Sequence, residues 1–277
     1  IPPVRREFVW NARADLGPTG GTPLPVILRV SAALDGEYGI PLWSRTFEVT
    51  TDGPEGQCAF VLQSTGDQAT CRIREDGTLW CWGYDCAGRM GQGNYPWDNC
   101  WGRTPIKVKN SDGGPGWSDW ISVSVGGVYN SQNHTCGIRA DRSLWCWGYG
   151  SNGELGVSTY SLNEGAKSLP TRVLSDGLWK HVAAGNYFTC GIQVDGSAWC
   201  WGQHYSGQLG NGRTSGNYQY NPARFSSDEP WRIVTTGYNH ACGIQENGTL
   251  WCWGDNNYGK LGNGTSYMSA LPVRVGE

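Results

Sequence analysis

The feature that most limits the fold of this 277-residue chain is a segment that recurs four times. Each copy opens with a cysteine, has an isoleucine two positions later, and closes with Trp-Cys-Trp-Gly. The copies span Cys71–Gly83, Cys136–Gly148, Cys190–Gly202 and Cys242–Gly254. Self-similarity of this kind is the signature of repeat architectures, in which each unit buries its apolar faces against its neighbours.

The same flanking patterns surround each copy. A strand-like run that ends in glycine precedes it, at Phe60–Gly66, Trp120–Gly127, Trp179–Gly185 and Trp231–Gly237. A glycine-rich loop follows it, and then a short strand that starts with proline, at Pro105–Val108, Pro170–Val173, Pro222–Phe225 and Pro272–Val275. Proline at the start of a strand removes no central ladder bond. Each repeat is therefore predicted to form four short strands, which make one blade of a β-propeller.

The two cysteines of each copy lie ten residues apart and flank a predicted hairpin turn with Asp or Asn at its centre. A three-residue hairpin loop fits these turns and places the paired cysteines directly opposite each other. The spacing of opposed residues suits a disulfide. We therefore expect the disulfides Cys71–Cys81, Cys136–Cys146, Cys190–Cys200 and Cys242–Cys252. In the second repeat Arg142 replaces the turn glycine, so this turn either holds a non-glycine residue at positive φ or takes another shape.

Strand alternation puts apolar side chains on both faces of each hairpin. In the first hairpin, Cys71, Ile73, Leu79 and Cys81 share one face, whereas the two tryptophans of Trp-Cys-Trp-Gly share the other. A propeller blade has a neighbour on each side, which buries both faces. The tryptophans are therefore predicted to form the core between blades, and a cofactor or photochemical role for them is not favoured.

In combination, these patterns resemble the repeat of the regulator of chromosome condensation, over about residues 58–276. The paired cysteines are similar to those of extracellular versions of that repeat, such as crinkly-type receptor ectodomains and secreted bacterial propellers. The resemblance implies a β-propeller, usually with more blades than the four repeats visible here. It leaves open whether the four repeats close a ring or form part of a larger assembly.

The first part of the chain lacks the repeat. Glu7–Asn11, Val26–Ala32 and Ser44–Thr50 are predicted as strands, and they resemble the end of an immunoglobulin-like sandwich. We therefore expect a partial β segment or linker over 1–55 and propeller repeats over 56–277. The predicted blades cover about 58–110, 118–175, 178–226 and 230–276.

Composition excludes several classes of function. Only 16% of the residues are charged and the net charge is −3, which is a poor footprint for binding nucleic acid. No apolar run is long enough for a transmembrane helix. The 11 cysteines at regular spacing predict an oxidising compartment, so the chain is expected to be secreted or on the cell surface.

No catalytic or metal-binding motif is apparent, so neither an enzyme, a metal site nor a cofactor is predicted. The histidines His134 and His240 precede hairpin cysteines, but Ala69 and Phe188 fill the same place in the other repeats. This variation favours structural packing over metal binding. The isolated His181 and His204 are predicted to lie at the surface.

Residues that the repeat does not require are the candidates for binding. The first repeat carries an insertion, Tyr84–Thr104, which a Cys86–Cys100 disulfide would pin, and Cys58 remains without an assigned partner. Exposed aromatic side chains on rigid loops are typical binding anchors. The candidates, in this insertion and in the matching intervals of the other repeats, are Tyr95, Trp97, Trp101, Tyr160, Tyr218, Tyr220 and Tyr267.

Three Asn-x-Ser/Thr sequons, at Asn133, Asn247 and Asn263, are candidate glycosylation sites if the source is a eukaryote.

The leading hypothesis is an extracellular module that binds a protein partner through propeller loops, in adhesion, ligand capture or inhibition. One alternative is a carbohydrate-binding lectin, whose pocket would usually repeat in each blade, whereas the off-pattern aromatic residues here differ between repeats. Another is a structural subunit of a surface assembly, with self-assembly of the chain. The sequence names neither the ligand nor the oligomeric state.

Overall fold

The computed structural model describes residues 26–28, 47–50, 59–61, 63–94, 100–127, 133–157, 165–225 and 229–276. The chain divides into two compact units, Ile1–Gln63 and Ser64–Glu277. In the first, the strands β1 (Val26–Leu28), β2 (Phe47–Thr50) and β3 (Ala59–Val61) form an antiparallel sheet in the order β1-β2-β3. Two of the predicted strands are thus present in shortened form, and the predicted strand Glu7–Asn11 lies outside the described residues.

The second unit contains four sheets, each of four strands in sequence order. Neighbouring strands pair antiparallel, as successive short strands joined by tight turns must. The sheets consist of β4 (Gln63–Thr65), β5 (Ala69–Ile73), β6 (Leu79–Tyr84) and β7 (Trp101–Lys107); β8 (Trp120–Val125), β9 (His134–Arg139), β10 (Leu144–Tyr149) and β11 (Ala166–Arg172); β12 (Trp179–Ala184), β13 (Phe188–Gln193), β14 (Ala198–Gly202) and β15 (Gln219–Arg224); and β16 (Trp231–Thr236), β17 (His240–Gln245), β18 (Leu250–Gly254) and β19 (Ser269–Arg274).

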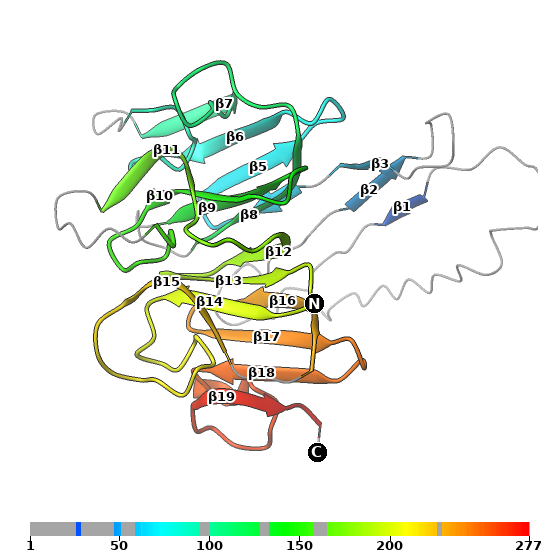
Figure 1. Ribbon diagram of the computed structural model, residues 1–277, viewed down its shortest axis with the longest axis vertical. Coiled ribbons are helices and arrows are strands. Elements are labelled where there is room, and N and C mark those ends of the chain that lie inside the picture. Colours follow the sequence, from blue (N-terminus) through cyan, green and yellow to red (C-terminus); the bar gives the residue numbers. More distant parts are fainter. Residues whose placement is uncertain are drawn as a thin grey trace, which may run out of the picture. The chain divides into compact units, whose positions relative to one another are not determined.

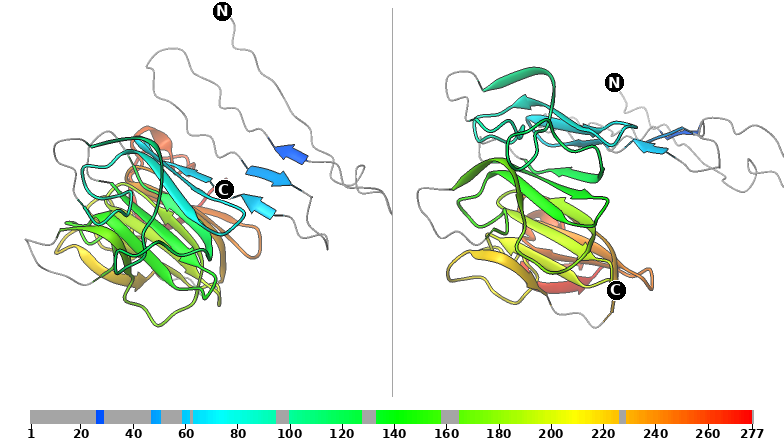
Figure 2. Two further views of the ribbon diagram at one scale, coloured as in Figure 1. Left: turned by 90° about the horizontal axis from the view of Figure 1, so that it is seen from above. Right: turned by 45° about the horizontal axis from the view of Figure 1, so that its top comes forward.

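This architecture confirms the predicted all-β propeller blades. Each repeat forms one sheet, and the four sheets follow one another in chain order in Figure 1, from β4–β7 to β16–β19. The views of Figure 2 show the same succession, from the cyan first sheet to the orange and red fourth sheet. The predicted first strand of the first repeat is divided between β3 and β4. Among the described residues the only helical segment is a short 3₁₀ turn, Asn257–Gly259, and no helix is long and apolar enough to cross a membrane.

The hairpin register is the predicted one, because each cysteine pair lies at directly opposed positions of the second and third strands. Four disulfides therefore lie within single hairpins, and a fifth closes the insertion of the first repeat. The pairs are Cys71–Cys81, Cys136–Cys146, Cys190–Cys200, Cys242–Cys252 and Cys86–Cys100. Cys58 lies outside the described residues.

A repeated hydrogen-bond relay explains why Asp or Asn precedes Ser or Thr at every hairpin turn. In the third sheet, Asp195 Oδ1 accepts from the backbone N–H and the hydroxyl of Ser197, and Trp199 Nε1 donates to the Ser197 Oγ. The other three hairpins repeat the relay with their own Asp or Asn, Ser or Thr, and Trp. Side-chain oxygens at such turns satisfy backbone groups that the ladder leaves unpaired.

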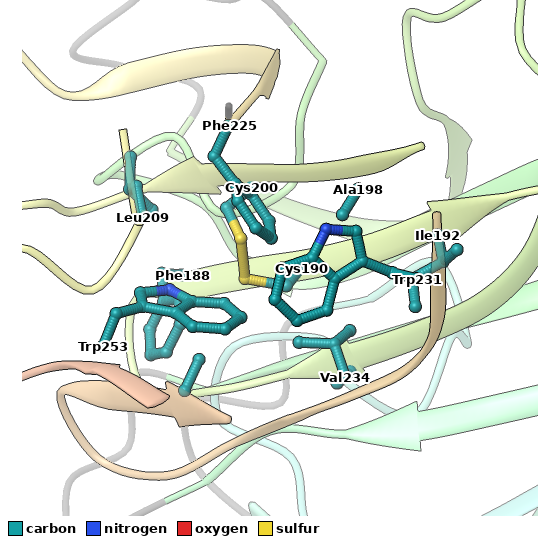
Figure 3. Close-up of a cluster of buried hydrophobic side chains, with 12 residues drawn as sticks. Phe188, Cys190, Ile192, Ala198, Cys200, Leu209, Phe225, Trp231, Val234 and Trp253 are labelled. Carbon is teal, nitrogen blue, oxygen red and sulfur yellow. A yellow bond between two sulfur atoms is a disulfide. The ribbon is translucent and has the colours of Figure 1, made fainter. Parts of the chain in front are cut away.

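The core lies between successive sheets. Figure 3 shows one of these layers, where Cys190, Ile192, Ala198 and Phe225 of the third sheet meet Trp231, Val234 and Trp253 of the fourth. The second tryptophan of the Trp-Cys-Trp-Gly motif is fully buried in the second, third and fourth sheets, as Trp147, Trp201 and Trp253. The first tryptophan of the motif is half-buried in every sheet. The predicted placement of apolar hairpin faces between blades is thereby confirmed at the three joints between successive sheets.

The packing within each sheet also explains why glycine occupies the middle position of Cys-Gly-Ile. A Cβ built on Gly191 would lie 2.6 Å from the ring of Trp179, the tryptophan that opens the first strand of the same sheet. The pairs Gly137 with Trp120 and Gly243 with Trp231 have the same geometry. Only glycine leaves room for an indole against the strand backbone at this position.

Candidate functional site

The candidate site lies at one end of the sheets. Because neighbouring strands run antiparallel, the loops from first to second strand and from third to fourth strand emerge at the same end of every sheet. We call this end the loop rim. The hairpin turns and the connections between sheets lie at the opposite end. A rigid sheet stack that presents variable loops at one end is a common arrangement for binding sites.

Five tyrosines of the second and third sheets gather at the loop rim, and we call them the tyrosine cluster: Tyr149, Tyr187, Tyr205, Tyr218 and Tyr220. The ring centroids of Tyr205 and Tyr218 are 5.7 Å apart, and those of Tyr218 and Tyr220 are 6.3 Å apart. Tyr149 and Tyr187 form a further edge-to-face pair at 6.3 Å. Edge-to-face geometry at these distances is favourable for aromatic rings.

Local structure holds these rings in place. His204 is buried, its Nε2 lies 3.0 Å from the Ser215 carbonyl oxygen, and its ring stacks on Tyr205 at 5.4 Å. The prediction that His204 lies at the surface is therefore wrong, because the histidine spans its loop from the inside and supports Tyr205. Tyr205 itself remains 49% exposed. A Cβ on Gly153 would lie 3.0 Å from the Tyr220 Cα, so the loop of the second sheet packs closely on Tyr220.

The hydroxyl group of Tyr218 stays protonated near neutral pH. Burial, followed by the neighbouring tyrosines Tyr205, Tyr220 and Tyr149, raises the pKa of Tyr218 above its ordinary value of 10.0. A neutral tyrosine presents an apolar ring together with a hydroxyl that both donates and accepts a hydrogen bond. The surface can therefore bury apolar atoms of a partner and still satisfy its polar groups.

The structure brings some of the predicted binding residues together and separates others. Tyr218 and Tyr220 lie in the tyrosine cluster, whereas Trp101 packs edge-to-face on Tyr84 at 5.2 Å and is 64% exposed. Tyr267 belongs to the loop of the fourth sheet and is 82% exposed. Tyr95, Trp97 and Tyr160 lie outside the described residues.

Three members of the cluster were missed in the sequence. Tyr149 directly follows Trp-Cys-Trp-Gly and Tyr187 directly precedes the second strand, so both occupy positions that the repeat fills in every copy. Comparing these positions between copies would have revealed them, because the third and fourth copies have Gln203 and Asp255 where Tyr149 stands. Tyr205 could have been found as the one aromatic residue that opens its Ser-Gly-Gln-Leu-Gly loop.

Several further titratable groups are buried in the described part of the chain. Glu154 and His134 are both fully buried, and burial raises the pKa of Glu154 to about 8 and lowers that of His134 to about 3. His134 Nε2 lies 2.7 Å from the Thr189 Oγ1, which confirms structural packing. Burial also raises the pKa of Asp85 to about 6 and lowers that of Arg89 to about 10. Within the part of the chain that the structure describes, no group of acidic, histidine and cysteine side chains is arranged to hold a metal ion.

The sequons differ in accessibility. Asn133 is only 1% exposed, so the folded sheet has no room for a glycan there, and this predicted site is wrong for the folded chain. Asn247 lies exposed in the turn of the fourth hairpin, and Asn263 is half-buried in a loop. These two remain candidate glycosylation sites.

The sequence repeats and the four-stranded sheets define the class of the protein, a β-propeller in which one repeat encodes one blade. Two family models, both described as the regulator of chromosome condensation (RCC1) repeat, match the sequence of this chain. One covers residues 141–192, 195–244 and 247–277, and the other covers 179–208 and 231–260. Residues 141–277 are therefore RCC1-type repeats, and the first repeat shares their sequence pattern and forms the same four-stranded sheet.

Known proteins resemble the chain at low identity. The ultraviolet-B receptor UVR8 of Arabidopsis thaliana is 26% identical over 212 residues, which are 76% of this chain and 44% of the relative. The mitochondrial RCC1 domain-containing protein RUG3 of the same plant is 27% identical over 244 residues, 87% of this chain and 52% of the relative. The chain thus spans about half the length of these curated relatives.

A solved structure with the same fold is that of Prp20p from Saccharomyces cerevisiae, a protein described as binding Gsp1p and histones. It superposes with a TM-score of 0.64 at 17% identity, over 86% of this chain and 52% of Prp20p. At this identity the likeness establishes the fold alone.

Proposed function

We propose that the chain is an extracellular module that binds a protein partner with its loop rim and catalyses no reaction. The observation that supports this most directly is the tyrosine cluster, in which rings from two adjacent sheets form one partly exposed surface. Tyrosine supplies a large contact area and a hydroxyl at a low cost in conformational entropy, and it is enriched at protein interfaces.

The scaffold suits such a role because little has to be ordered on binding. The loops start and end on disulfide-bonded hairpins, and the Cys86–Cys100 disulfide closes the insertion that carries Trp101. A preorganised surface loses less conformational entropy on association than a flexible one. Prp20p, which shares the fold, offers a precedent for protein ligands on this scaffold.

Disulfides support an extracellular location. Five of them in the described part of the chain would be reduced in the cytosol of most organisms, so they favour a secreted or surface-exposed protein. Gsp1p and histones, the partners named for Prp20p, are therefore not proposed for this chain, which is acidic with a sequence pI of about 5.8.

The distribution of the tyrosines favours a protein partner over a sugar. A lectin propeller usually repeats its pocket in each blade, but Tyr149 is matched by Gln203 and Asp255 in the next two repeats. The cluster is thus a composite of two sheets. Composite surfaces of this kind suit a single asymmetric partner.

Affinity capture tests the proposal. The intact chain is immobilised and exposed to extracellular material from its source, next to a Tyr205→Ala, Tyr218→Ala double variant. A Leu178→Ala, Val194→Ala double variant is the matched control, because these exposed side chains lie at the hairpin end of the third sheet. We expect the tyrosine variant to bind the captured protein about tenfold more weakly or worse, as loss of central interface aromatics does, while the control is unchanged.

Three results would count against the proposal. Equal capture by the wild type and the tyrosine variant would show that the partner does not bind at the tyrosine cluster of the loop rim. Loss of capture only after glycans are enzymatically stripped from the material would favour the lectin alternative. A Trp97→Ala, Trp101→Ala variant that alone abolishes capture would move the site to the insertion of the first repeat.

A further inference from the structure

The three joints between successive sheets share one construction. In each joint a tryptophan of the incoming sheet donates its Nε1–H to a loop carbonyl of the preceding sheet, at 2.8–2.9 Å. The pairs are Trp147 with Arg89, Trp201 with Glu154 and Trp253 with Gln208. At two joints a threonine hydroxyl, from Thr135 or Thr189, donates to the same carbonyl. We call the side with the tryptophan and threonine the incoming face.

The other side of each joint is the disulfide side of the preceding hairpin, which we call the receiving face. Its cysteines, isoleucine and third-strand apolar residue are buried in the first three sheets, where Leu79, Leu144 and Ala198 are at most 3% exposed. A buried Met or Leu directly follows the accepting loop carbonyl in each case, as Met90, Leu155 and Leu209.

The fourth sheet carries a complete receiving face that nothing in the described residues covers. Leu250, the counterpart of Leu79, is 40% exposed, and Cys242, Ile244 and Val275 are half-buried where their counterparts in the third sheet are buried. Lys260 stands where Arg89, Glu154 and Gln208 supply the accepting carbonyl, and the buried Leu261 follows it.

The first sheet carries the matching incoming face. Trp82 and Thr70 lie at opposed positions of β6 and β5, like Trp201 and Thr189 in the third sheet. Both are half-buried, whereas Trp147, Trp201, Trp253, Thr135 and Thr189 are fully buried. Within the described residues, both halves of a joint that forms three times internally are thus left without a covering sheet.

We infer that two copies of this chain associate head to tail, with the incoming face of the first sheet of one copy on the receiving face of the fourth sheet of the other. Thr70 and Trp82 of the incoming copy then donate to the Lys260 carbonyl. The reciprocal contact makes a second identical joint, so the pair closes into an eight-bladed ring with twofold symmetry. Propellers of this size are within the known range, and closure prevents open-ended filaments.

One position of the first sheet departs from the internal joints. Arg72 stands where the later sheets have Gly137, Gly191 and Gly243, and the first strand of this repeat opens with Phe60 in place of tryptophan. Arg72 is exposed. The joint between copies consequently rests on the Thr70–Trp82 pair and on the apolar receiving face, and it is weaker than the internal joints.

The molar mass of the 277-residue chain in solution tests the inference. Light scattering and sedimentation over a wide concentration range should show a reversible shift from the 30.3 kDa monomer to a dimer. Leu250→Glu should raise the dimer dissociation constant roughly tenfold or more, because it buries an unpaired carboxylate in the joint. Leu178→Glu, at an exposed leucine directly before the third sheet, should leave the constant unchanged.

Mixing distinguishes head-to-tail association from other arrangements. Thr70→Glu should also weaken self-association, yet a mixture of Thr70→Glu and Leu250→Glu chains should form a mixed dimer through its one intact joint. A Thr70→Glu chain that still dimerises normally would indicate contact between two fourth sheets and would overturn the inference. A wild-type chain that stays monomeric at every concentration would overturn it too, and this measurement does not depend on the folding of any variant.

Discussion

At the scale of single residues, Arg142 carries a conformational cost that the other repeats avoid. It sits in the second hairpin turn with a φ of 66°, where the other hairpins have Gly77, Gly196 and Gly248. The sequence left open whether Arg142 adopts positive φ or the turn changes shape. The turn keeps the shape of the other hairpins, and Arg142 adopts positive φ. Side chains at positive φ are disfavoured, so Arg142→Gly should raise the free energy of unfolding by about 0.5–1 kcal/mol.

Guanidinium unfolding of the oxidised chain measures this effect. Gly248→Arg is the mirror control, because its φ is 84° and a Cβ there meets no heavy atom within 4 Å. The loss of unfolding free energy in Gly248→Arg then measures the cost of the positive φ without a steric clash. If Arg142→Gly left the transition unchanged or moved it to lower denaturant, the strain assigned to Arg142 would be wrong.

Glu154 makes stability depend on pH. Its pKa is about 8 in the folded chain against an ordinary 4.5, so the unfolded chain ionises first as pH rises. Stability is then lost progressively between about pH 4.5 and pH 8. Gln208 fills the same place in the next repeat, and its Oε1 accepts from the Ser206 N–H as the Glu154 Oε2 accepts from the Asn152 N–H.

Glu154→Gln keeps this hydrogen bond and removes the ionisation, so it should stabilise the chain by on the order of 2 kcal/mol at alkaline pH and far less near pH 5. Thermal unfolding of the wild type and Glu154→Gln at alkaline pH and at pH 5 measures this difference. Gln208→Glu introduces a buried carboxyl group, so this variant should become less stable relative to the wild type as the pH rises. The buried His134 destabilises the fold as pH falls below about 6.5, but wild type and variant share it, so it cancels in the comparison. A gain independent of pH would contradict the prediction.

At the scale of elements, the relay in the hairpin turns couples a turn to a tryptophan. Ser197→Ala removes the hydroxyl that links Asp195 to the Trp199 Nε1, and it should cost about 1 kcal/mol of unfolding free energy. Ser197→Thr should cost little, since Thr78 and Thr249 serve the same relay in other hairpins. Denaturant unfolding of the Ser197→Ala and Ser197→Thr variants separates the effect of the hydroxyl from the effect of side-chain volume. An equal loss of unfolding free energy in both variants would refute the relay.

The hairpins were also the elements that sequence predicted best. A turn of fixed length sets the register, and the register determines which cysteines meet, so Cys190 and Cys200 could be paired from spacing alone. The first strand of the first repeat was not predicted as two pieces, β3 and β4. Its sequence alternates like the other first strands, and nothing local marks the break.

The candidate site was less accessible to prediction, because it depends on contacts between sheets. Tyr218 and Tyr220 were found as departures from the repeat, whereas Tyr149 and Tyr187 sit at positions that every repeat fills. His204 was misplaced for a related reason. An isolated histidine gives no periodic signal, and its burial follows from a loop that closes over it.

At the scale of the whole propeller, stability should vary along the row of sheets. In a repeat protein each unit contacts mainly its neighbours, so end units are held by one interface and inner units by two. The burial of equivalent side chains follows this order, since Ile192 of the third sheet is fully buried and Ile244 of the fourth is half-buried. Backbone pairing within the two sheets is the same, so the difference arises between sheets.

Hydrogen exchange should therefore be slower in β13 and β14 than in β17 and β18. Local opening of the fourth sheet breaks one joint, whereas opening of the third breaks two, so we expect about tenfold or greater protection in the third at low protein concentration. Mass spectrometry of the oxidised chain measures this. Uniform protection would mean that the sheets open only together. If the head-to-tail joint forms, β17 and β18 must gain protection as the chain is concentrated, while β13 and β14, already covered on both sides, do not.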